Sequence, residues 1–215
     1  MIQDTYRHKG LRKNLIELLR EKGIQDEKVL EALDKVPRHA FLDPAFMEQA
    51  YEDIAFRIGA GQTISQPYTV AFQTQELQVK KGDKILEIGT GSGYQASVLL
   101  AMGAKLVSIE RQRELFLKSK VIINDLGYNA KLNYGDGFRG NEMYAPYDKI
   151  IVTCGAPYVP EALVKQLKNG GRMIIPVGEG DVQEMILITK DLEGNVKEEL
   201  KGDFRFVPML KDKAK

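Results

Sequence analysis

Apolar positions between residues 1 and 60 recur at the spacing of an α-helix. The leucines that share the inward face of the first predicted helix are Leu11, Leu15, Leu18 and Leu19. Gly23 suits the end of that helix, and a second helix is predicted over 26–35, where Pro37 forces the chain out. A third is predicted to begin with Asp43 as N-cap and Pro44 at its first position. The pattern predicts a helical cap over 1–60.

From residue 84 onward, short apolar runs alternate with helical patterns. The predicted strands are 84–88, 106–109, 130–133, 149–152 and 172–177. Alternation of this kind is typical of right-handed crossovers, so we expect a doubly wound α/β fold with a mainly parallel sheet. Two further strands, 185–189 and 196–200, are predicted to form an antiparallel extension joined by a Gly194-Asn195 turn.

The apolar run 85–88 leads directly into glycines at Gly89, Gly91 and Gly93. Glycine at such a turn lets the backbone approach a ligand that a Cβ would displace, so the segment predicts a nucleoside site. A dinucleotide fingerprint would place its third small residue where Tyr94 stands. Glu87 precedes the turn, and its carboxylate would attract a cationic amino-acid group but repel a pyrophosphate.

Acidic residues follow the next two predicted strands. Glu110 lies 19 positions after Gly91, where an acid can accept hydrogen bonds from both hydroxyls of a ribose. It would serve NAD equally well, so it does not choose between cofactors. Asp136, between Gly135 and Gly137, is either a turn residue or a partner for an adenine amino group. The carboxyl ends of parallel strands meet at one edge, which favours the second interpretation.

A glycine-rich loop over 59–63 precedes the predicted strand 84–88 and runs into another predicted helix. Ser65 is predicted to be the N-cap of that helix, with Pro67 in its first turn. An isolated Ser-x-Pro is usually structural. Here the loop lies between the cap and the nucleoside strand, so the Ser65 hydroxyl can also face a ligand.

Composition narrows the partners and the compartment. The chain has 215 residues and a net charge of +1, which gives no basic footprint for nucleic acid. No apolar stretch approaches the ~20 residues of a membrane span, and a secretory signal is not evident. One cysteine, Cys154, is compatible with the cytoplasm and is predicted to be a small core residue. His8 and His39 lack metal-ligand spacing, so we expect no metal site.

Several motifs together resemble one enzyme family, the protein-L-isoaspartate O-methyltransferases of the bacterial and archaeal type, within the class I S-adenosylmethionine-dependent methyltransferases. The matching segments are Val36-Pro37-Arg38-His39, Ala50-Tyr51-Glu52-Asp53, Gly61-Gln62-Thr63-Ile64-Ser65-Gln66-Pro67-Tyr68, Leu86-Glu87-Ile88-Gly89-Thr90-Gly91-Ser92-Gly93-Tyr94-Gln95, Ser108-Ile109-Glu110-Arg111, Gly135-Asp136-Gly137, Ala145-Pro146-Tyr147-Asp148, Gly170-Gly171-Arg172-Met173 and Arg205-Phe206-Val207-Pro208. The Thr63–Pro67 segment is the one that separates this family from other methyltransferases.

The resemblance implies a Rossmann-like core, S-adenosylmethionine as cofactor with S-adenosylhomocysteine as product, and methyl transfer to the α-carboxylate of isoaspartyl residues in damaged proteins and peptides. Ser65 would be the catalytic-site serine. The residues expected to contact cofactor are Ile64, Ser65, Glu87, Gly89, Thr90, Gly91, Ser92, Glu110, Arg111, Asp136 and Gly137. Those expected to contact substrate are Thr63, Ser65, Arg205, Phe206 and Val207.

We expect one cytoplasmic domain, a monomer in preference to an oligomer, with no nucleic acid or membrane partner. Its expected parts are the cap over 1–60, an active-site loop and helix over 61–80, a cofactor core over 81–180, and strands and tail over 181–215. The alternatives are another small-molecule methyltransferase, an NAD-dependent oxidoreductase, or a non-catalytic cofactor-binding protein.

Two local expectations concern charged residues. Glu52 and Asp53 are expected to form structural salt bridges with Arg57 or Arg38. The lysine-rich segment 211–215 is expected to be a frayed tail.

Overall fold

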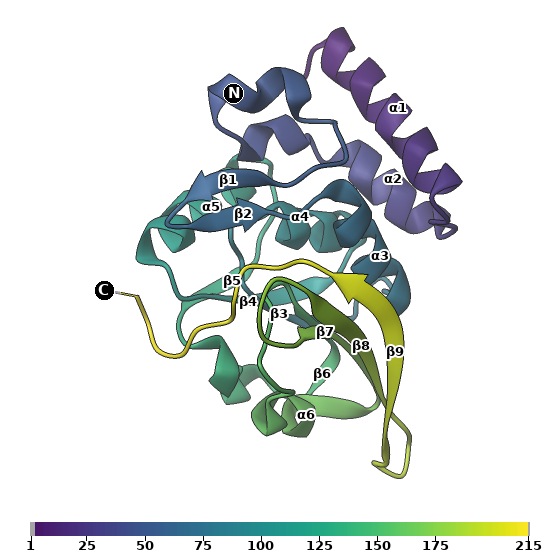
Figure 1. Cartoon of the computed structure of the whole chain (residues 1–215), viewed down its shortest axis with the longest axis vertical. Coiled ribbons are helices and arrows are strands. Elements are labelled where there is room, and N and C mark those ends of the chain that lie inside the picture. Colours follow the sequence, from purple (N-terminus) through teal and green to yellow (C-terminus); the bar gives the residue numbers. More distant parts are fainter. Residues whose placement is uncertain (1–2, 215) are drawn as a thin grey trace.

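A seven-stranded sheet forms the centre of the computed structural model, which describes residues 3–214. Its strand order is β5-β4-β3-β6-β7-β8-β9, parallel from β5 to β7 and antiparallel at the last two strands. The strands are β3 (Lys84–Ile88), β4 (Lys105–Glu110), β5 (Lys131–Tyr134), β6 (Tyr147–Val152), β7 (Leu167–Val177), β8 (Gln183–Lys190) and β9 (Val196–Phe204). The predicted doubly wound, mainly parallel architecture is confirmed, with strand ends shifted by a few residues (Figure 1).

Alternating side chains of the central strands pack on opposite faces of this sheet. Ile85 packs with α3 (Pro67–Leu77), α4 (Tyr94–Ala101) and α5 (Arg113–Asp125), whereas Leu86 packs on the face covered by α6 (Glu161–Gln166). Both side chains are fully buried. Two short turns, η3 (Gly137–Arg139) and η4 (Glu142–Tyr144), lie between β5 and β6.

The N-terminal cap packs onto α3 and α4 from outside and so adds a further layer on that face (Figure 1). It comprises α1 (Tyr6–Glu21), α2 (Glu27–Lys35), η1 (Arg38–Phe41) and η2 (Pro44–Gln49). Asp43 caps the third of the predicted helices, which is a 3-10 helix, by accepting a hydrogen bond from the Ala45 amide at 3.0 Å. Leu18, predicted to face inward, is 37% exposed, because the buried stripe of α1 runs through Leu15, Ile16 and Leu19.

A short hairpin was missed by the sequence analysis, which assigned 1–60 to helices and 59–63 to a loop. β1 (Phe56–Gly59) pairs antiparallel with β2 (Gln62–Ile64). Three consecutive residues in the left-handed region, Gly59, Ala60 and Gly61, make the tight connection. The hairpin places the segment after β2 over the carboxyl ends of the central strands (Figure 1).

Within residues 3–214, no helix combines the length and the apolar character needed to cross a bilayer.

Candidate active site

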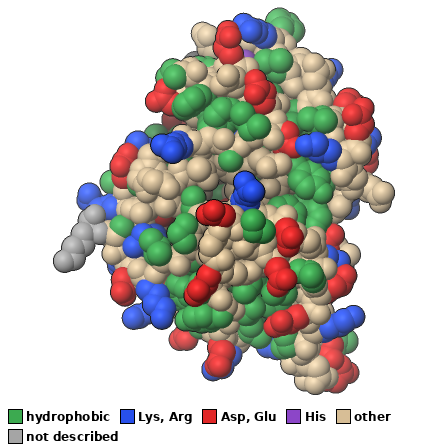
Figure 2. Space-filling view, in the orientation of Figure 1, with side chains coloured by type: hydrophobic (Ala, Val, Ile, Leu, Met, Phe, Trp, Pro, Cys, Tyr) green, Lys and Arg blue, Asp and Glu red, His purple; other side chains and the backbone are tan. Residues whose placement is uncertain are grey.

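A cavity opens at the carboxyl ends of β3 and β4, below the loop from β2 to α3. Figure 2 shows a hollow near the middle of the face that Figure 1 presents, with basic and acidic side chains beside it. The predicted site residues that line the cavity are Thr63, Ile64, Ser65, Gly89, Thr90, Gly91, Ser92, Glu110, Arg111, Gly137 and Val207. The structure therefore brings together residues from five separate segments of the sequence.

The glycine turn forms one wall of the cavity and requires glycine at position 89. Gly89 has φ +96°, and its amide donates to the Ile109 carbonyl at 2.8 Å. A Cβ there would lie 2.6 Å from Thr153 Oγ1, whose hydroxyl hydrogen-bonds the Ile88 and Gly89 carbonyls at 2.9 and 2.6 Å. Thr153 thus occupies the volume a side chain would need and holds the turn against β6.

Glu110 ends β4 at the cavity wall and is only 4% exposed. Its carboxylate accepts hydrogen bonds from the Gly91 amide at 2.8 Å and the Gln112 amide at 2.7 Å. Burial raises the pKa of this carboxyl, and the two backbone bonds oppose that rise. A carboxylate has about four acceptor positions, so Glu110 can still accept hydrogen bonds from the hydroxyl groups of a ligand in the cavity.

Glu87, for which a direct contact with the cofactor was expected, lies behind the turn and is not among the residues that line the cavity. Its side chain is fully buried and accepts a 2.5 Å hydrogen bond from Ser108, whose hydroxyl also lies 2.6 Å from that of Thr90. Burial raises the pKa of Glu87 to about 8, and the neighbouring Glu110 carboxylate adds to the rise. Near neutral pH Glu87 is therefore mostly an uncharged carboxylic acid. Of the three hydrogen-bonded residues Glu87, Ser108 and Thr90, only Thr90 lines the cavity.

Because Glu87 is a buried acid with a raised pKa, we expect the free energy of unfolding to depend on pH, and Glu87→Gln should remove this dependence. The raised folded-state pKa means that the folded protein keeps a proton which the unfolded chain releases above its ordinary value of 4.5. Stability is thus fully present at low pH and lost as pH rises toward 8, by up to about 1.4 kcal/mol per pH unit. Urea denaturation at about pH 5.5 and pH 7.5 should show the variant gaining on the wild-type protein. Parallel pH profiles would contradict the assignment.

Ser65 lies in the cavity wall between the end of β2 and the start of α3. It is not the N-cap that the sequence analysis predicted. The N-cap is Gln66, which makes no side-chain capping bond, and the Asp53 carboxylate instead accepts from the Tyr68 amide at 2.7 Å. An acceptor from another part of the chain caps α3, which leaves the Ser65 hydroxyl available to the cavity.

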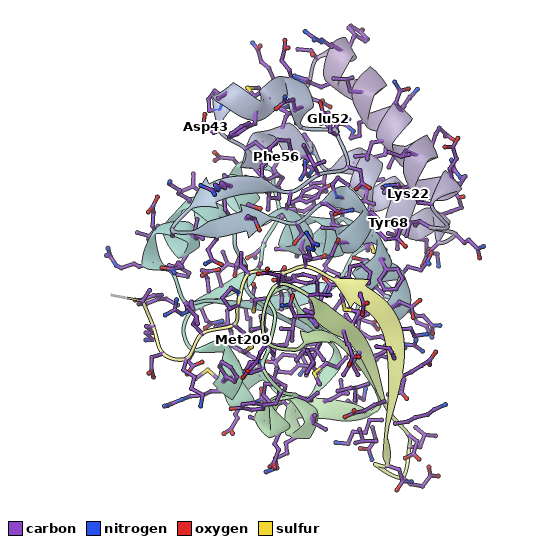
Figure 3. The ribbon with its side chains drawn as sticks, in the orientation of Figure 1. Lys22, Asp43, Glu52, Phe56, Tyr68 and Met209 are labelled. Atoms are coloured by element: carbon purple, nitrogen blue, oxygen red, sulfur yellow. The ribbon has the colours of Figure 1, made fainter. Side chains whose placement is uncertain are left out.

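Asp53 also corrects the expected salt bridges with Arg57 or Arg38. Its second oxygen pairs with Lys22 at 2.6 Å, at the end of α1. Figure 3 shows Lys22 and Tyr68 close together, with the ammonium nitrogen 5.7 Å from the centre of the Tyr68 ring. The acid therefore joins the cap to the first turn of α3.

Besides Glu87, three predicted contact residues lie outside the cavity wall. Asp136 accepts from the Phe138 amide at 2.9 Å and the Asp212 amide at 3.1 Å, and so caps a turn. Phe206 uses its amide to bind Gln183 at 2.8 Å, and Arg205 borders a separate groove beside Tyr68. Of the residues 205–207 expected to contact substrate, Val207 lines the cavity, as do Pro208, Met209 and Leu210 after it.

Other wall residues were not among the expected contacts, although several of them lie in the motifs quoted above. These are Gln62, Val70, Ile88, Tyr94, Gln95, Ile109, Thr153, Cys154, Pro208, Met209 and Leu210. Cys154 packs against the hydrophobic core as predicted and also borders the cavity, because it lies two residues beyond the end of β6. The segment after β9 was expected at the substrate as far as Val207. Its next three residues were not, because their position depends on backbone contacts with Gly155.

That segment crosses the strand ends and is held by backbone hydrogen bonds (Figure 1). Gly155 donates to the Val207 carbonyl at 2.8 Å and accepts from the Met209 amide at 2.7 Å; Met209 is labelled in Figure 3. The Ala214 amide donates to the Arg111 carbonyl at 3.0 Å. The prediction of a frayed tail is wrong for 211–214, and Lys215 lies outside the described residues.

The two histidines meet in the cap, which their spacing did not predict. Their rings stack with centres 3.9 Å apart, and potential ligand atoms of Asp4, His8 and His39 lie within 4.8 Å of one another. The Arg12 guanidinium binds both Asp4 oxygens at 3.1 and 3.0 Å, and the Tyr51 hydroxyl pairs with His39 at 2.7 Å. A fixed cation beside the carboxylate opposes a metal ion, so these contacts favour a packing role.

Comparisons with known proteins show which family this chain resembles. The family model described as protein-L-isoaspartate (D-aspartate) O-methyltransferase matches residues 10–214. A relative from Cytophaga hutchinsonii, named protein-L-isoaspartate O-methyltransferase, is 57% identical over 97% of this chain and 95% of its own length.

Two solved structures are also similar. One, a protein-L-isoaspartate O-methyltransferase, has a TM-score of 0.83 and 32% identity; the match covers 92% of this chain but only 65% of that one. A putative protein-L-isoaspartate O-methyltransferase from Plasmodium falciparum, in complex with S-adenosyl-L-homocysteine, has a TM-score of 0.82 and 27% identity over 94% of this chain and 99% of its own.

Proposed function

This chain belongs to the protein-L-isoaspartate O-methyltransferase family, and we propose that the cavity below Ser65 is where it methylates its substrate. The protein is an enzyme that uses S-adenosylmethionine to methylate the free α-carboxylate of L-isoaspartyl residues in damaged proteins and peptides. The observation that carries the assignment of the site is that Ser65, the glycine turn and Glu110 border one cavity.

The chemistry of the wall fits this cofactor. Glu110 offers acceptors for the ribose hydroxyls, and the turn at Gly89 and Gly91 gives a ligand the close backbone approach that a Cβ would prevent. The buried Gln95 side-chain oxygen, which has no hydrogen-bond partner among residues 3–214, is an acceptor at the same wall. When bound there, the sulfonium of S-adenosylmethionine supplies a methyl group that a nucleophile can take.

The substrate brings its own nucleophile, so the wall needs no general base. A carboxyl group with an ordinary pKa of about 4 is ionised at pH 7. We assign to Ser65 the task of orienting this carboxylate by donating a hydrogen bond to one oxygen. Apolar wall residues such as Ile64, Ile88 and Val207 exclude water, which otherwise stabilises the separated charges more than the less charged transition state.

Selection of isoaspartate depends on the backbone around the reacting carboxylate, because the two isomers differ only in where one methylene lies. We propose that Thr63 and Val207, which both line the cavity, contact the substrate chain there. The groove that includes Arg205 lies next to Gln66 and is suited to flanking residues of the same chain. Release of the methyl ester then allows collapse to a succinimide and return of a normal aspartyl bond.

We further propose that the chain acts as a single cytoplasmic domain and as a monomer, without nucleic acid. Cap residues and residues of α3 and α4 share one hydrophobic cluster, which supports a single folding unit. The single cysteine supports the cytoplasmic assignment, and the net charge of +1 supports the absence of a nucleic-acid partner.

Methyl transfer can be tested with a matched pair of peptides. Labelled S-adenosylmethionine and an isoaspartyl peptide should give a labelled ester, whereas the aspartyl isomer of the same peptide should give none. Transfer to neither peptide, with transfer to a small carboxylic or hydroxyl compound, would favour a different methyltransferase activity. Hydride exchange with NAD would favour an oxidoreductase.

A further inference from the structure

Arg38 is a fully buried cation with no acidic partner in the part of the chain that the structure describes. Its exposed fraction is 0%, and none of the ion pairs formed by residues 3–214 involves it. Burial lowers its pKa to about 10, which still leaves it charged at pH 7. Burying an unpaired guanidinium is costly, so its hydrogen bonds must compensate for lost water. Those bonds therefore indicate what the residue holds in place.

All three of its hydrogen bonds go to backbone carbonyls from segments that are distant in the sequence. Nη1 donates to the Ala50 carbonyl at 2.6 Å. Nη2 donates to the Ile54 carbonyl at 2.9 Å and to the Ser65 carbonyl at 3.1 Å. A planar fork with several donors is suited to this arrangement, which a lysine ammonium on a flexible stem does not reproduce.

Two aromatic rings enclose the guanidinium and connect it to the cavity. Its central carbon lies 5.4 Å from the centre of the Phe56 ring, on β1 (Figure 3), and 5.6 Å from that of Tyr94. Tyr94 begins α4 directly after the glycine turn and also borders the cavity. Arg38 thus lies between the cap, the Ser65 segment and the glycine-turn wall.

The Ser65 carbonyl lies where regular structure offers it no partner. β2 ends at Ile64, which pairs with Phe56, and the first backbone bond of α3 goes to the Gln66 carbonyl. Ser65 belongs to neither element. Fixing its carbonyl fixes the peptide plane after Ser65, and so limits where the side chain on the same residue can point.

We propose that Arg38 is a positioning residue for methyl transfer, which acts through the Ser65 carbonyl to hold the Ser65 hydroxyl toward the substrate carboxylate. This inference rests on the proposed function of the cavity. The alternative is that Arg38 only stabilises the cap, in which case its loss would lower stability without a specific effect on Ser65. A displacement of a positioning group by about 1 Å can cost a hundredfold in rate, so the two roles are separable.

A double-mutant cycle distinguishes them. Arg38→Lys should lower kcat about tenfold or more, while the dissociation constant of S-adenosylhomocysteine stays within about twofold. In a protein that already carries Ser65→Ala, the same Arg38→Lys change should alter kcat by less than about twofold, because the hydroxyl it positions is absent. Arg12→Lys is the matched control, since Arg12 is also buried in the cap but binds Asp4 and Tyr51. It should leave kcat near the wild-type value.

Equal losses of kcat in the Ser65 and Ser65→Ala proteins would overturn the proposal, as would an unchanged kcat in Arg38→Lys. If Arg38→Lys does not fold, Arg38→Gln replaces it in the test, because glutamine retains two amide donors. Failure of both to fold while Arg12→Lys folds would assign Arg38 to stability alone and also overturn it. An inactive wild-type protein would instead reject the proposed function, and a fall in kcat confined to Ser65→Ala would reject only the role of Arg38.

Discussion

Ser65→Ala is expected to lower kcat toward an isoaspartyl peptide about ten- to a hundredfold, because a hydrogen bond to a charged group contributes about 1.5–3 kcal/mol. The fold should be unaffected. α3 begins at Pro67, its N-cap is Gln66, and the Tyr68 amide is held by Asp53. Steady-state kinetics and thermal unfolding on the same variant would measure both effects.

Asp53→Asn provides the complementary control. It removes the charge that caps α3 and pairs with Lys22, so stability should fall by about 1 kcal/mol. A Ser65→Ala protein that loses stability but turns over within about twofold of wild type would reject the orienting role and restore Ser65 as a structural residue.

Glu110→Ala is expected to weaken S-adenosylhomocysteine binding tenfold or more, through the loss of charge-assisted hydrogen bonds to the ribose worth about 1.5–3 kcal/mol each. The structure adds a second cause. The same carboxylate holds the Gly91 and Gln112 amides, so its removal also releases the glycine turn. Calorimetry on the purified protein would measure the dissociation constant.

Glu110→Gln tests how much of the effect comes from the charge. The amide keeps one of the two acceptor oxygens that hold the Gly91 and Gln112 amides, and it places a donor at the other. Binding that is weakened by the alanine variant and largely retained by the glutamine variant would show that the negative charge contributes little. An unchanged dissociation constant in both would place the ribose elsewhere, and tighter binding of NAD than of S-adenosylhomocysteine would reject the methyltransferase site.

The parallel sheet and its glycine turn could be predicted because local patterns determine them. Three features can be interpreted from the residues next to them: the apolar run that ends at Ile88, the glycines that follow it, and the acid at Glu110. The same holds for Asp43, whose capping role was predicted from its neighbour Pro44. Such features need no information about the rest of the chain.

Contacts between distant segments could not be predicted in the same way. Asp53 caps a helix that begins 14 residues later in the sequence, and this is why Ser65 was given a capping role it does not have. Glu87 was expected at the cofactor because its charge was considered without its burial. The segment 207–210 forms a wall only because Gly155 binds it. Each error follows from a partner that the local sequence does not reveal.

The position of Cys154 bears on how this protein avoids damage by its own reagent. A methyl sulfonium alkylates thiolates, and the sole cysteine of the chain borders the cavity proposed to bind one. Burial, with a contribution from the nearby Glu110 carboxylate, raises the pKa of the thiol to about 12. At pH 7 almost none of the thiol is then in the reactive thiolate form. The negative environment that suits a cationic methyl donor thereby also keeps the adjacent sulfur chemically inert.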